Sequence, residues 1–172
     1  TLTTTVQAAT VTGETVIVGD DTPGPGDPIT YESCFTNTGS ETAYNGVFLS
    51  TMPSNTVLDL TSVSIDGGSA VTIVSTALPP VPADLPYHYN TDTDVLTLQL
   101  GDLVSTPGSN EICVEFTAIL DDPLAAGVAI DFPAGSPKFT YENEGGDPYP
   151  DTEPTEDPAT FPSGGVEVDQ IY

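Results

Sequence analysis

The sequence predicts an all-β protein: an immunoglobulin-like antiparallel β-sandwich with extended N- and C-terminal arms. Three observations support this fold class. Apolar and polar residues alternate in short runs, as half-buried strands require. Turn segments separate these runs, in a chain that contains 16 Gly and 17 Pro. No stretch keeps the 3.6-residue period of an amphipathic helix, and about seven to nine short strands at this spacing are typical of an immunoglobulin-like sandwich.

The predicted strands follow one another at short intervals along the middle of the chain. They cover residues 16–18, 29–37, 47–49, 57–65, 71–74, 95–100 and 112–120. The segments between them, such as DDTPGPGDP, NTGSE and DGGS, carry the Gly, Pro, Asn and Asp residues that tight turns need. Alternation within a strand separates a core face from an outer face. On two of the strands the predicted core face consists of Ile29, Tyr31, Ser33, Phe35, Ile112, Val114, Phe116 and Ala118.

The two ends differ from this pattern and divide the chain into three parts. Residues 1–12 (TLTTTVQAATVT) form a strand-prone arm, residues 13–140 form the sandwich, and residues 141–172 form a C-terminal arm. The C-terminal arm is rich in Pro and acidic residues. Because Pro cannot donate to a strand ladder, we expect an extended conformation there. Its last residues, GGVEVDQIY, predict one further short strand.

Two long segments carry a family resemblance. The first, GDPITYESCFTNTGSETAYNGVFLSTMPSN, combines a Gly-Asp step, a strand with Tyr, a Thr-Asn-Thr-Gly turn and a strand that leads to Pro. The second, YHYNTDTDVLTLQLGDLVSTPGSNEICVEFTAIL, contains a hairpin, a Leu-Gly-Asp-Leu step, a Pro-Gly turn and a final alternating strand. Over residues 26–120 they resemble the conserved immunoglobulin-like repeat domain of prokaryotic secreted and cell-surface proteins. The resemblance implies an extracellular or cell-surface protein without a catalytic constellation, although the family's usual Lys and Arg are missing here.

The charge balance argues against two classes of partner. Twenty-six Asp and Glu residues face one basic residue, Lys138, and the net charge is −25. Nucleic-acid binding depends on clustered Lys and Arg, and docking on an anionic membrane depends on a polybasic segment, so we expect neither. No run approaches the roughly 20 apolar residues that span a bilayer. A surface of this kind suits a saline environment, since the Debye length falls to about 3 Å at 1 M salt.

The two cysteines, Cys34 and Cys113, each lie in the middle of a predicted strand. Alternation places both on the outer face, with Glu111 and Glu115 beside Cys113. The fold allows the two strands to be neighbours, and an even cysteine count in an extracellular protein favours a bridge. The sequence therefore predicts a cross-strand disulfide on the surface, with two unpaired thiols as the alternative.

Acidic clusters make calcium a candidate ligand, although the predicted function requires no cofactor. Asn90, Asp92 and Asp94 alternate in NTDTD, and Asp121 and Asp122 are adjacent after the last long strand. Calcium takes six to eight oxygen ligands, and the chain has no complete loop of the EF-hand type. We favour a solvated acidic surface over a calcium site at any one of these clusters.

Other reactive residues do not form a catalytic set in the sequence. His88 is the single His and cannot build a transition-metal site alone, so we expect a structural or surface role for it. The nucleophile pattern GxSxG is absent, and we expect no enzyme. Lys138 is a candidate for an isopeptide bond with Asn37 or Asn143 beside Glu142, but an ordinary ion pair with a carboxylate is favoured.

These observations favour a structural subunit of an extracellular filament or surface layer, which binds further copies of itself head to tail. In strand donation, a strand of one subunit completes the sheet edge of the next, and a head-to-tail contact that does not close makes a fibre. The preferred donor is the N-terminal arm, with one face formed by Leu2, Thr4, Val6 and Ala8. The second choice is the last predicted strand, with Val166 and Val168 on one face. The alternatives are a binding or spacer module of a large secreted adhesin and, in third place, a secreted enzyme.

Overall fold

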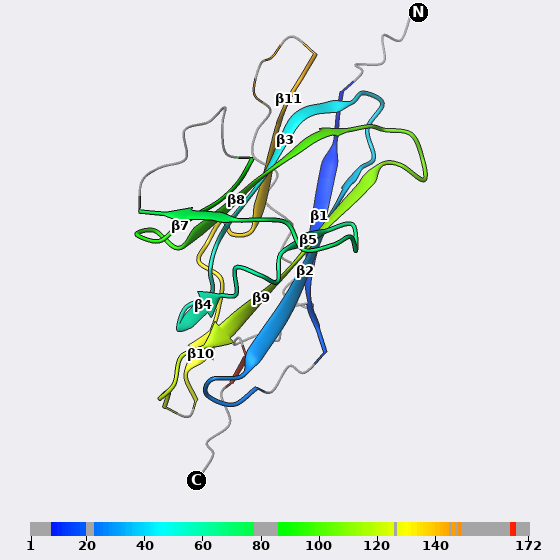
Figure 1. Cartoon of the computed structure of the whole chain (residues 1–172). Coiled ribbons are helices and arrows are strands. Elements are labelled where there is room, and N and C mark those ends of the chain that lie inside the picture. The colour runs from blue at the N-terminus through cyan, green and yellow to red at the C-terminus, as the bar shows by residue number, and fades with distance from the viewer. Residues whose placement is uncertain are drawn as a thin grey trace, which may run out of the picture.

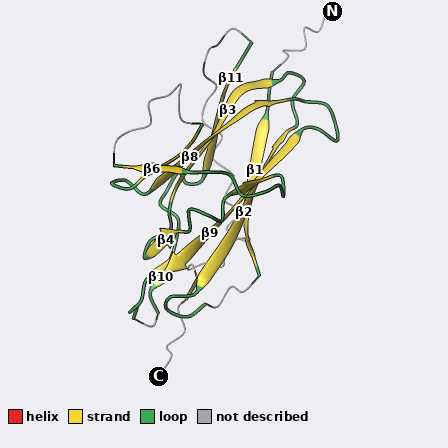
Figure 2. Cartoon of the chain, viewed as in Figure 1, coloured by secondary structure: helices red, strands yellow, loops and turns green. Residues whose placement is uncertain are grey.

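The computed structural model describes residues 8–19, 23–77, 86–125, 127–144, 146 and 148, together with the backbone of residues 166–167. All regular elements in this part of the chain are strands (Figure 2). The first sheet contains β1 (Val11–Val18), β2 (Pro28–Asn37), β9 (Glu111–Leu120), β4 (Thr56–Leu58) and β5 (Ser64–Ile65). The second sheet contains β11 (Lys138–Glu142), β3 (Ala43–Thr51), β8 (Val95–Leu103), β7 (Tyr87–Asn90) and β6 (Val74–Thr76). A separate pair consists of β10 (Ala129–Ile130) and β12 (Val166–Glu167).

The two sheets form the predicted immunoglobulin-like sandwich (Figure 1). In the first sheet β2 lies between β1 and β9, and β9 is flanked on its other side by β4 and β5. β1 is therefore the outer strand at one edge. In the second sheet the order is β11-β3-β8-β7-β6, and only β6 and β7 pair in parallel among the described strands. The described residues contain no helix that is long and apolar enough to cross a membrane.

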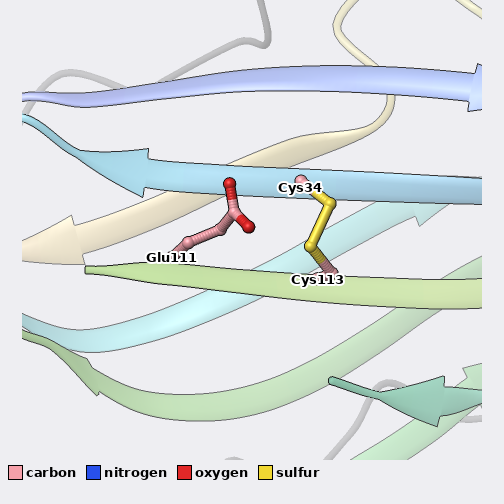
Figure 3. Close-up of side chains that lie close together, drawn as sticks. All are labelled: Cys34, Glu111 and Cys113. Atoms are coloured by element: carbon pink, nitrogen blue, oxygen red, sulfur yellow. A yellow bond between two sulfur atoms is a disulfide. The ribbon is translucent and has the colours of Figure 1, made fainter. Parts of the chain in front are cut away.

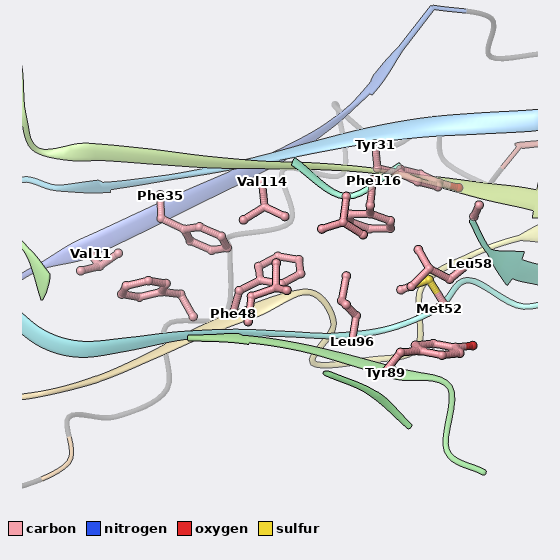
Figure 4. Close-up of a cluster of buried hydrophobic side chains, with 14 of the residues drawn as sticks. Val11, Tyr31, Phe35, Phe48, Met52, Leu58, Tyr89, Leu96, Val114 and Phe116 are labelled. Atoms are coloured by element: carbon pink, nitrogen blue, oxygen red, sulfur yellow. The ribbon is translucent and has the colours of Figure 1, made fainter. Parts of the chain in front are cut away.

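Aromatic side chains join the two sheets across the core (Figure 4). Phe35 on β2 stacks on Phe139 of β11, with 5.1 Å between the ring centroids. Phe48 on β3 lies 6.1 Å from Phe116 on β9 by the same measure. Tyr31 on β2 is buried as well, and this burial, with Asp131 nearby, raises the pKa of its hydroxyl above the ordinary value. The core therefore holds the two sheets together mainly through ring contacts and apolar burial.

The predicted core face is confirmed on both central strands. Ile29, Tyr31, Ser33 and Phe35 are buried, and the residues between them are only half-buried. On β9 the buried residues are Val114, Phe116, Ala118 and Leu120, while Ile112 packs against the edge of the core. Strict alternation predicts these positions because β2 and β9 pair without a register shift.

Several predicted boundaries differ from the structure. Residues 57–65 form two short strands, β4 and β5, because Asp59 turns the chain between them. Its Oδ1 accepts hydrogen bonds from the Thr61 N–H (2.9 Å) and from Thr61 Oγ1 (2.7 Å), and these bonds hold the pKa of Asp59 below its usual value. β6 begins at Val74, where the predicted strand ends. The predicted boundary after residue 12 falls inside β1, and the predicted end of the sandwich at residue 140 falls inside β11.

The described chain begins and ends at opposite ends of the sandwich (Figure 1). Ala8 lies next to Ser40, just beyond the end of β2. β12 pairs with β10 at the other end, where Ser54 Oγ donates to the carbonyl of Ala129 (3.2 Å). The 10 residues of β2 run between these ends and span about 33 Å.

Candidate functional site: the β1 edge and the turn that holds it

The hydrogen bonds of β1 leave one row of its backbone groups facing away from the sheet. All eight residues of the strand pair with β2. Just before the strand, the Thr38 N–H donates to the Thr10 carbonyl (2.8 Å) and the Ser40 N–H donates to the Ala8 carbonyl (2.9 Å). Antiparallel strands bond at every second residue, so the even-numbered residues of β1 bond to β2. The odd-numbered residues therefore present their N–H and C=O groups to the outside.

This outward row consists of the backbone groups of Val11, Gly13, Thr15 and Ile17. Within the part of the chain that the structure describes, no strand pairs with it. Edge strands are commonly protected by Pro, Lys or a bulge. β1 has none of these and carries one charged residue, Glu14. We call this row the β1 edge, and its chemistry is that of a site for an added strand.

A turn at residues 37–41 fixes the segment that leads into β1. The turn is organised by Asn37, whose side chain is fully buried. Both ends of its amide are satisfied. Oδ1 accepts hydrogen bonds from the N–H groups of Thr10 (3.2 Å) and Gly39 (3.1 Å), and Nδ2 donates to the carbonyls of Glu41 (2.7 Å) and Leu103 (3.0 Å). One side chain thus ties the end of β2, the end of β8 and the segment before β1 together.

Gly39 makes room for that segment. A Cβ atom at this position would overlap the carbonyl oxygen of Ala8 and the nitrogen of Thr10, so a larger residue does not fit without a backbone shift. The Thr-Asn-Thr-Gly turn therefore has two separable roles: Asn37 supplies hydrogen bonds and Gly39 supplies space. In the sequence alone these residues are recognisable only as turn formers. The contact with Thr10 is not evident there, because Thr10 and Asn37 are 27 residues apart in the chain.

The last residue of the preferred donor strand, Ala8, is hydrogen-bonded within its own subunit. The Ala8 N–H donates to Ser40 Oγ (3.3 Å), and the Ala8 carbonyl accepts from the Ser40 N–H (2.9 Å). Ala8 thus pairs with its own sandwich, and residues 1–7 are the part of the predicted donor arm that precedes this contact. The other predicted donor residues, Leu2, Thr4 and Val6, lie outside the described residues.

The second predicted donor overlaps β12. The backbone of Val166 pairs with Ile130 of the same chain, and Glu167 pairs with Ala129. Val168 lies outside the described residues. Because its described backbone is already paired within the subunit, this segment is the weaker candidate for donation.

The predicted disulfide is present and joins β2 to β9 (Figure 3). Cys34 and Cys113 lie directly opposite one another, with 4.1 Å between their Cα atoms. Side chains approach most closely at this type of cross-strand position, which is not hydrogen-bonded. The Glu111 carboxylate lies within 4.8 Å of both sulfurs. These sulfurs are bonded to each other and offer no thiolate, so the three residues do not form a metal site.

The outer face of the first sheet is acidic around this disulfide. It carries Glu14, Glu32, Glu111 and Glu115. Glu32 lies directly opposite Glu115, whereas Glu14 lies opposite Cys34. Like charges at directly opposed positions destabilise a strand pair. We therefore expect this face to be more stable when salt screens the carboxylates.

Replacing one member of the opposed pair tests this expectation. Glu115→Thr should raise the free energy of unfolding by roughly 0.5 kcal/mol at low ionic strength, because it removes a like-charge pair and places a strand-forming residue on β9. The gain should shrink in 1 M NaCl, where the repulsion is screened. Urea unfolding at both salt concentrations measures the effect. Glu14→Thr is the control, since its directly opposed residue is Cys34. A gain from Glu115→Thr that is the same at both salt concentrations would contradict charge repulsion as its cause.

The structure uses two of the calcium candidates to build the β7–β8 turn. Asn90 Oδ1 accepts hydrogen bonds from the N–H groups of Asp92 (2.9 Å) and Thr93 (3.2 Å). Asp94 Oδ1 accepts the hydroxyl of Tyr89 (2.8 Å), and burial together with this bond raises the pKa of Tyr89.

The remaining candidates are surface residues of two separate loops. Asp92, Asp121 and Asp122 are exposed. Asp121 donates its backbone N–H to the carbonyl of Asn55 (3.0 Å). Among the described residues, the Asp candidates form no set of three His, Cys, Asp or Glu ligand atoms within 4.8 Å of one another. Nothing in this geometry gathers the six to eight oxygens that calcium takes.

His88 has a structural position inside the second sheet. Its ring is fully buried on β7, and Nε2 lies 2.8 Å from Thr76 Oγ1 of the neighbouring strand β6. No described residue hydrogen-bonds to Nδ1. The ring therefore packs as a core side chain that ties β7 to β6.

The structure does not favour the two isopeptide partners considered for Lys138. Lys138 pairs with Leu49, whereas Asn37 bonds to Leu103, which pairs with Ala43 at the other end of β3. Six residues of strand separate these positions, or about 20 Å. Asn143 follows β11 at five residues from Lys138, about 16 Å along a strand. The nearby carboxylate of Glu142 accepts a hydrogen bond from Asn45 Nδ2 (2.8 Å).

Comparison with known proteins shows a shared fold and no sequence relative. No protein-family model matches this chain, and no curated protein matches its sequence. A solved structure of BcpA, the major pilin subunit of Bacillus cereus, is 15% identical with a TM-score of 0.53, over 83% of this chain and 38% of the pilin. A putative membrane anchored protein from Corynebacterium diphtheriae is 10% identical with a TM-score of 0.50, over 95% of this chain and 36% of that protein. The chain thus spans less than two fifths of either neighbour. At these identities the likeness establishes the immunoglobulin-like sandwich as the common fold.

Proposed function

We propose that this chain is a structural subunit of an extracellular filament or surface layer, assembled head to tail by strand donation. One observation carries the proposal. The described chain begins and ends at opposite ends of the sandwich, with Ala8 fixed at one end and β12 paired at the other. A subunit with this arrangement can contact one neighbour through each end, and a contact between two different surfaces propagates without closing.

The remaining support concerns location and chemistry. The Cys34–Cys113 disulfide suits an oxidising compartment outside the cytoplasm. The pilin and the membrane anchored protein named above share the fold, although this likeness is only one of architecture. The proposed role needs neither catalysis nor a cofactor. Its partner is a second copy of the same chain, and the net charge of −25 favours assembly in saline surroundings.

The proposed donor is now limited to residues 1–7. Deleting them should abolish filaments while the protein stays folded as a monomer, because Ala8 and all of β1 remain in place. Negative-stain microscopy and light scattering in 1 M NaCl measure assembly, and urea unfolding checks the fold.

A longer deletion provides the comparison. Removing residues 1–12 also removes the Ala8 and Thr10 contacts with the 37–41 turn, so this variant should lose stability as well as assembly. Filaments that persist unchanged after deletion of residues 1–7 would refute this donor.

A spacer or binding module of a larger surface adhesin is the second candidate. The chain corresponds to less than two fifths of the neighbours with this fold, so the same architecture also serves as one part of a longer protein. The purified chain alone distinguishes the two. Self-assembly supports the filament subunit, whereas a monomer at high concentration and high salt supports the module.

A further inference from the structure

We propose that the β1 edge is the acceptor site for assembly, and that its occupant is the segment 1–7 of a second copy, bound parallel to β1. This inference rests on the proposed function and names the site and the partner segment. Binding would make the first sheet of the acceptor subunit one strand wider, with the added strand on the outside of β1.

The acceptor is the outer edge of β1, which no described strand covers and which pairing with β2 holds in place. The outward groups of Thr15 and Ile17 lie in the half of β1 farther from the 37–41 turn, and those of Gly13 lie just before that half. Thr15 is buried and shares a hydrogen bond with Ser33 on β2, with 2.7 Å between the hydroxyl oxygens. Ile17 packs against the core. The backbone groups are therefore held in strand geometry before any partner arrives. This preorganisation reduces the loss of conformational entropy when the partner binds.

The occupant fits this edge in length and composition. The segment TLTTTVQ contains no Pro, no Gly and no charged residue, and most of its residues are β-branched. Seven extended residues span about 23 Å, close to the length of the eight-residue strand β1. The 37–41 turn fixes the point from which the segment leaves its own subunit, because it holds Ala8 and Thr10.

Charge favours the segment over a contact between two whole subunits. Each chain carries a net charge of −25, so two sandwiches placed side by side repel. An uncharged segment reaches the neighbour's edge while the acidic bodies remain stacked end to end. A symmetric β1–β1 contact would instead place two acidic sheets together and would close a dimer.

Chain direction fixes the pairing as parallel. β1 runs in chain order from the 37–41 turn toward the start of β2. Residues 1–7 precede Ala8, which the same turn holds, so a segment that extends from Ala8 away from its own sandwich would follow the same direction in an end-to-end stack. When both subunits have the same orientation, the donated segment and the neighbour's β1 therefore run the same way. Parallel pairs form evenly spaced bonds, and the outward N–H and C=O groups of β1 would supply one side of them.

A proline at an outward N–H tests the acceptor. Ile17→Pro removes a donor that faces away from β2, a position where an edge strand tolerates Pro. Ile17→Ala is the matched control, since it removes most of the same side chain and keeps the N–H. We expect filament yield to fall at least about tenfold in Ile17→Pro, while Ile17→Ala stays within about twofold of the wild type. Circular dichroism and non-reducing mass analysis check that both variants remain folded with the disulfide intact.

Hydrogen exchange provides a readout that needs no substitution in β1. In wild-type filaments the amides of Gly13, Thr15 and Ile17 should exchange at least about tenfold more slowly than in the monomer that lacks residues 1–7. The amide of Phe139 is the internal control. Met52 bonds toward β8 and Thr51 bonds toward the β11 side, so the even-numbered residues of β3 face β8. Phe139 lies opposite Phe48, an even-numbered residue, and its N–H therefore faces away from β3.

The outcomes separate this inference from the proposed function. Filaments of normal yield from Ile17→Pro, or unchanged exchange at the three amides, would overturn the β1 edge as acceptor and leave a filament that assembles at another surface. Discrete dimers with protected β1 amides would overturn the segment 1–7 as occupant in favour of a β1–β1 contact. If the wild-type chain forms no filaments under any salt condition, the proposed function itself is ruled out.

Discussion

Asn37→Ala is expected to lower the free energy of unfolding by about 2–4 kcal/mol, because it leaves one buried and three partly buried backbone groups without the bonds they make to this side chain. The substitution removes both acceptor contacts of Oδ1 and both donor contacts of Nδ2. The N–H groups of Thr10 and Gly39 and the carbonyls of Glu41 and Leu103 would then lack the bonds they make to this amide. Urea unfolding measures the loss, and faster amide exchange at Thr38 and Ser40, which donate to the carbonyls of Thr10 and Ala8, would show that the segment before β1 is released.

Asn110→Ala is the matched control for this loss. Asn110 contacts the same residue from outside, where its Nδ2 donates one bond to the carbonyl of Asn37 (3.1 Å). It is only half-buried, and we expect its removal to cost about 1 kcal/mol. Equal losses from the two variants would contradict a special role for Asn37. Unchanged exchange at Thr38 and Ser40 in Asn37→Ala would show that the backbone bonds hold the segment without the Asn37 amide.

Removing the disulfide should lower the free energy of unfolding at least as much as Asn37→Ala does. In Cys34→Ser with Cys113→Ser, the free energy of unfolding should fall by roughly 4 kcal/mol, because the bridge closes a loop of about 80 residues in the unfolded chain. The bridged residues are 79 positions apart. β2 and β9 keep their full ladder, so the variant should remain folded with the same strands. Urea unfolding against the oxidised wild type measures the difference.

Alkylation provides the control for the disulfide. The oxidised wild type should incorporate no label without reductant, and two labels after reduction, as its mass would show. An unfolding midpoint that does not change between oxidised and serine-substituted protein would contradict a stabilising role. Two labelled thiols in the native protein would contradict the bridge itself.

The sequence predicted the central strands because their pattern is local. Alternation assigned Tyr31, Phe35 and Phe116 to the core and both cysteines to the outer face, and the register of β2 against β9 confirms this arrangement. These strands are long and buried on one face, so each side chain's position follows from its neighbours along the chain. The division of residues 57–65 was missed because a single turn residue, Asp59, interrupts a run that is otherwise strand-like.

The candidate site could be predicted only in part because it depends on distant contacts. The first residues of β1 read as an arm, since VTGETV has little alternation and gains its strand geometry from pairing with β2. The roles of Asn37 and Gly39 require Thr10 and Ala8 to lie beside them. Nothing in the local sequence specifies this arrangement. The pairing partner of an edge strand is likewise a property of the whole sheet, which composition alone does not encode.

The disulfide between the two central strands has a mechanical consequence. If the chain of one subunit were pulled from its two ends, force that peels its strands apart would reach the bridge between Cys34 and Cys113. The chain between them, 79 residues in sequence separation, cannot extend while the bridge is intact. At about 3.5 Å per extended residue, this withholds roughly 280 Å of contour length from every subunit under load. The bridge would therefore limit how far a pulled subunit lengthens, and it would carry tension only after the strands outside it have yielded.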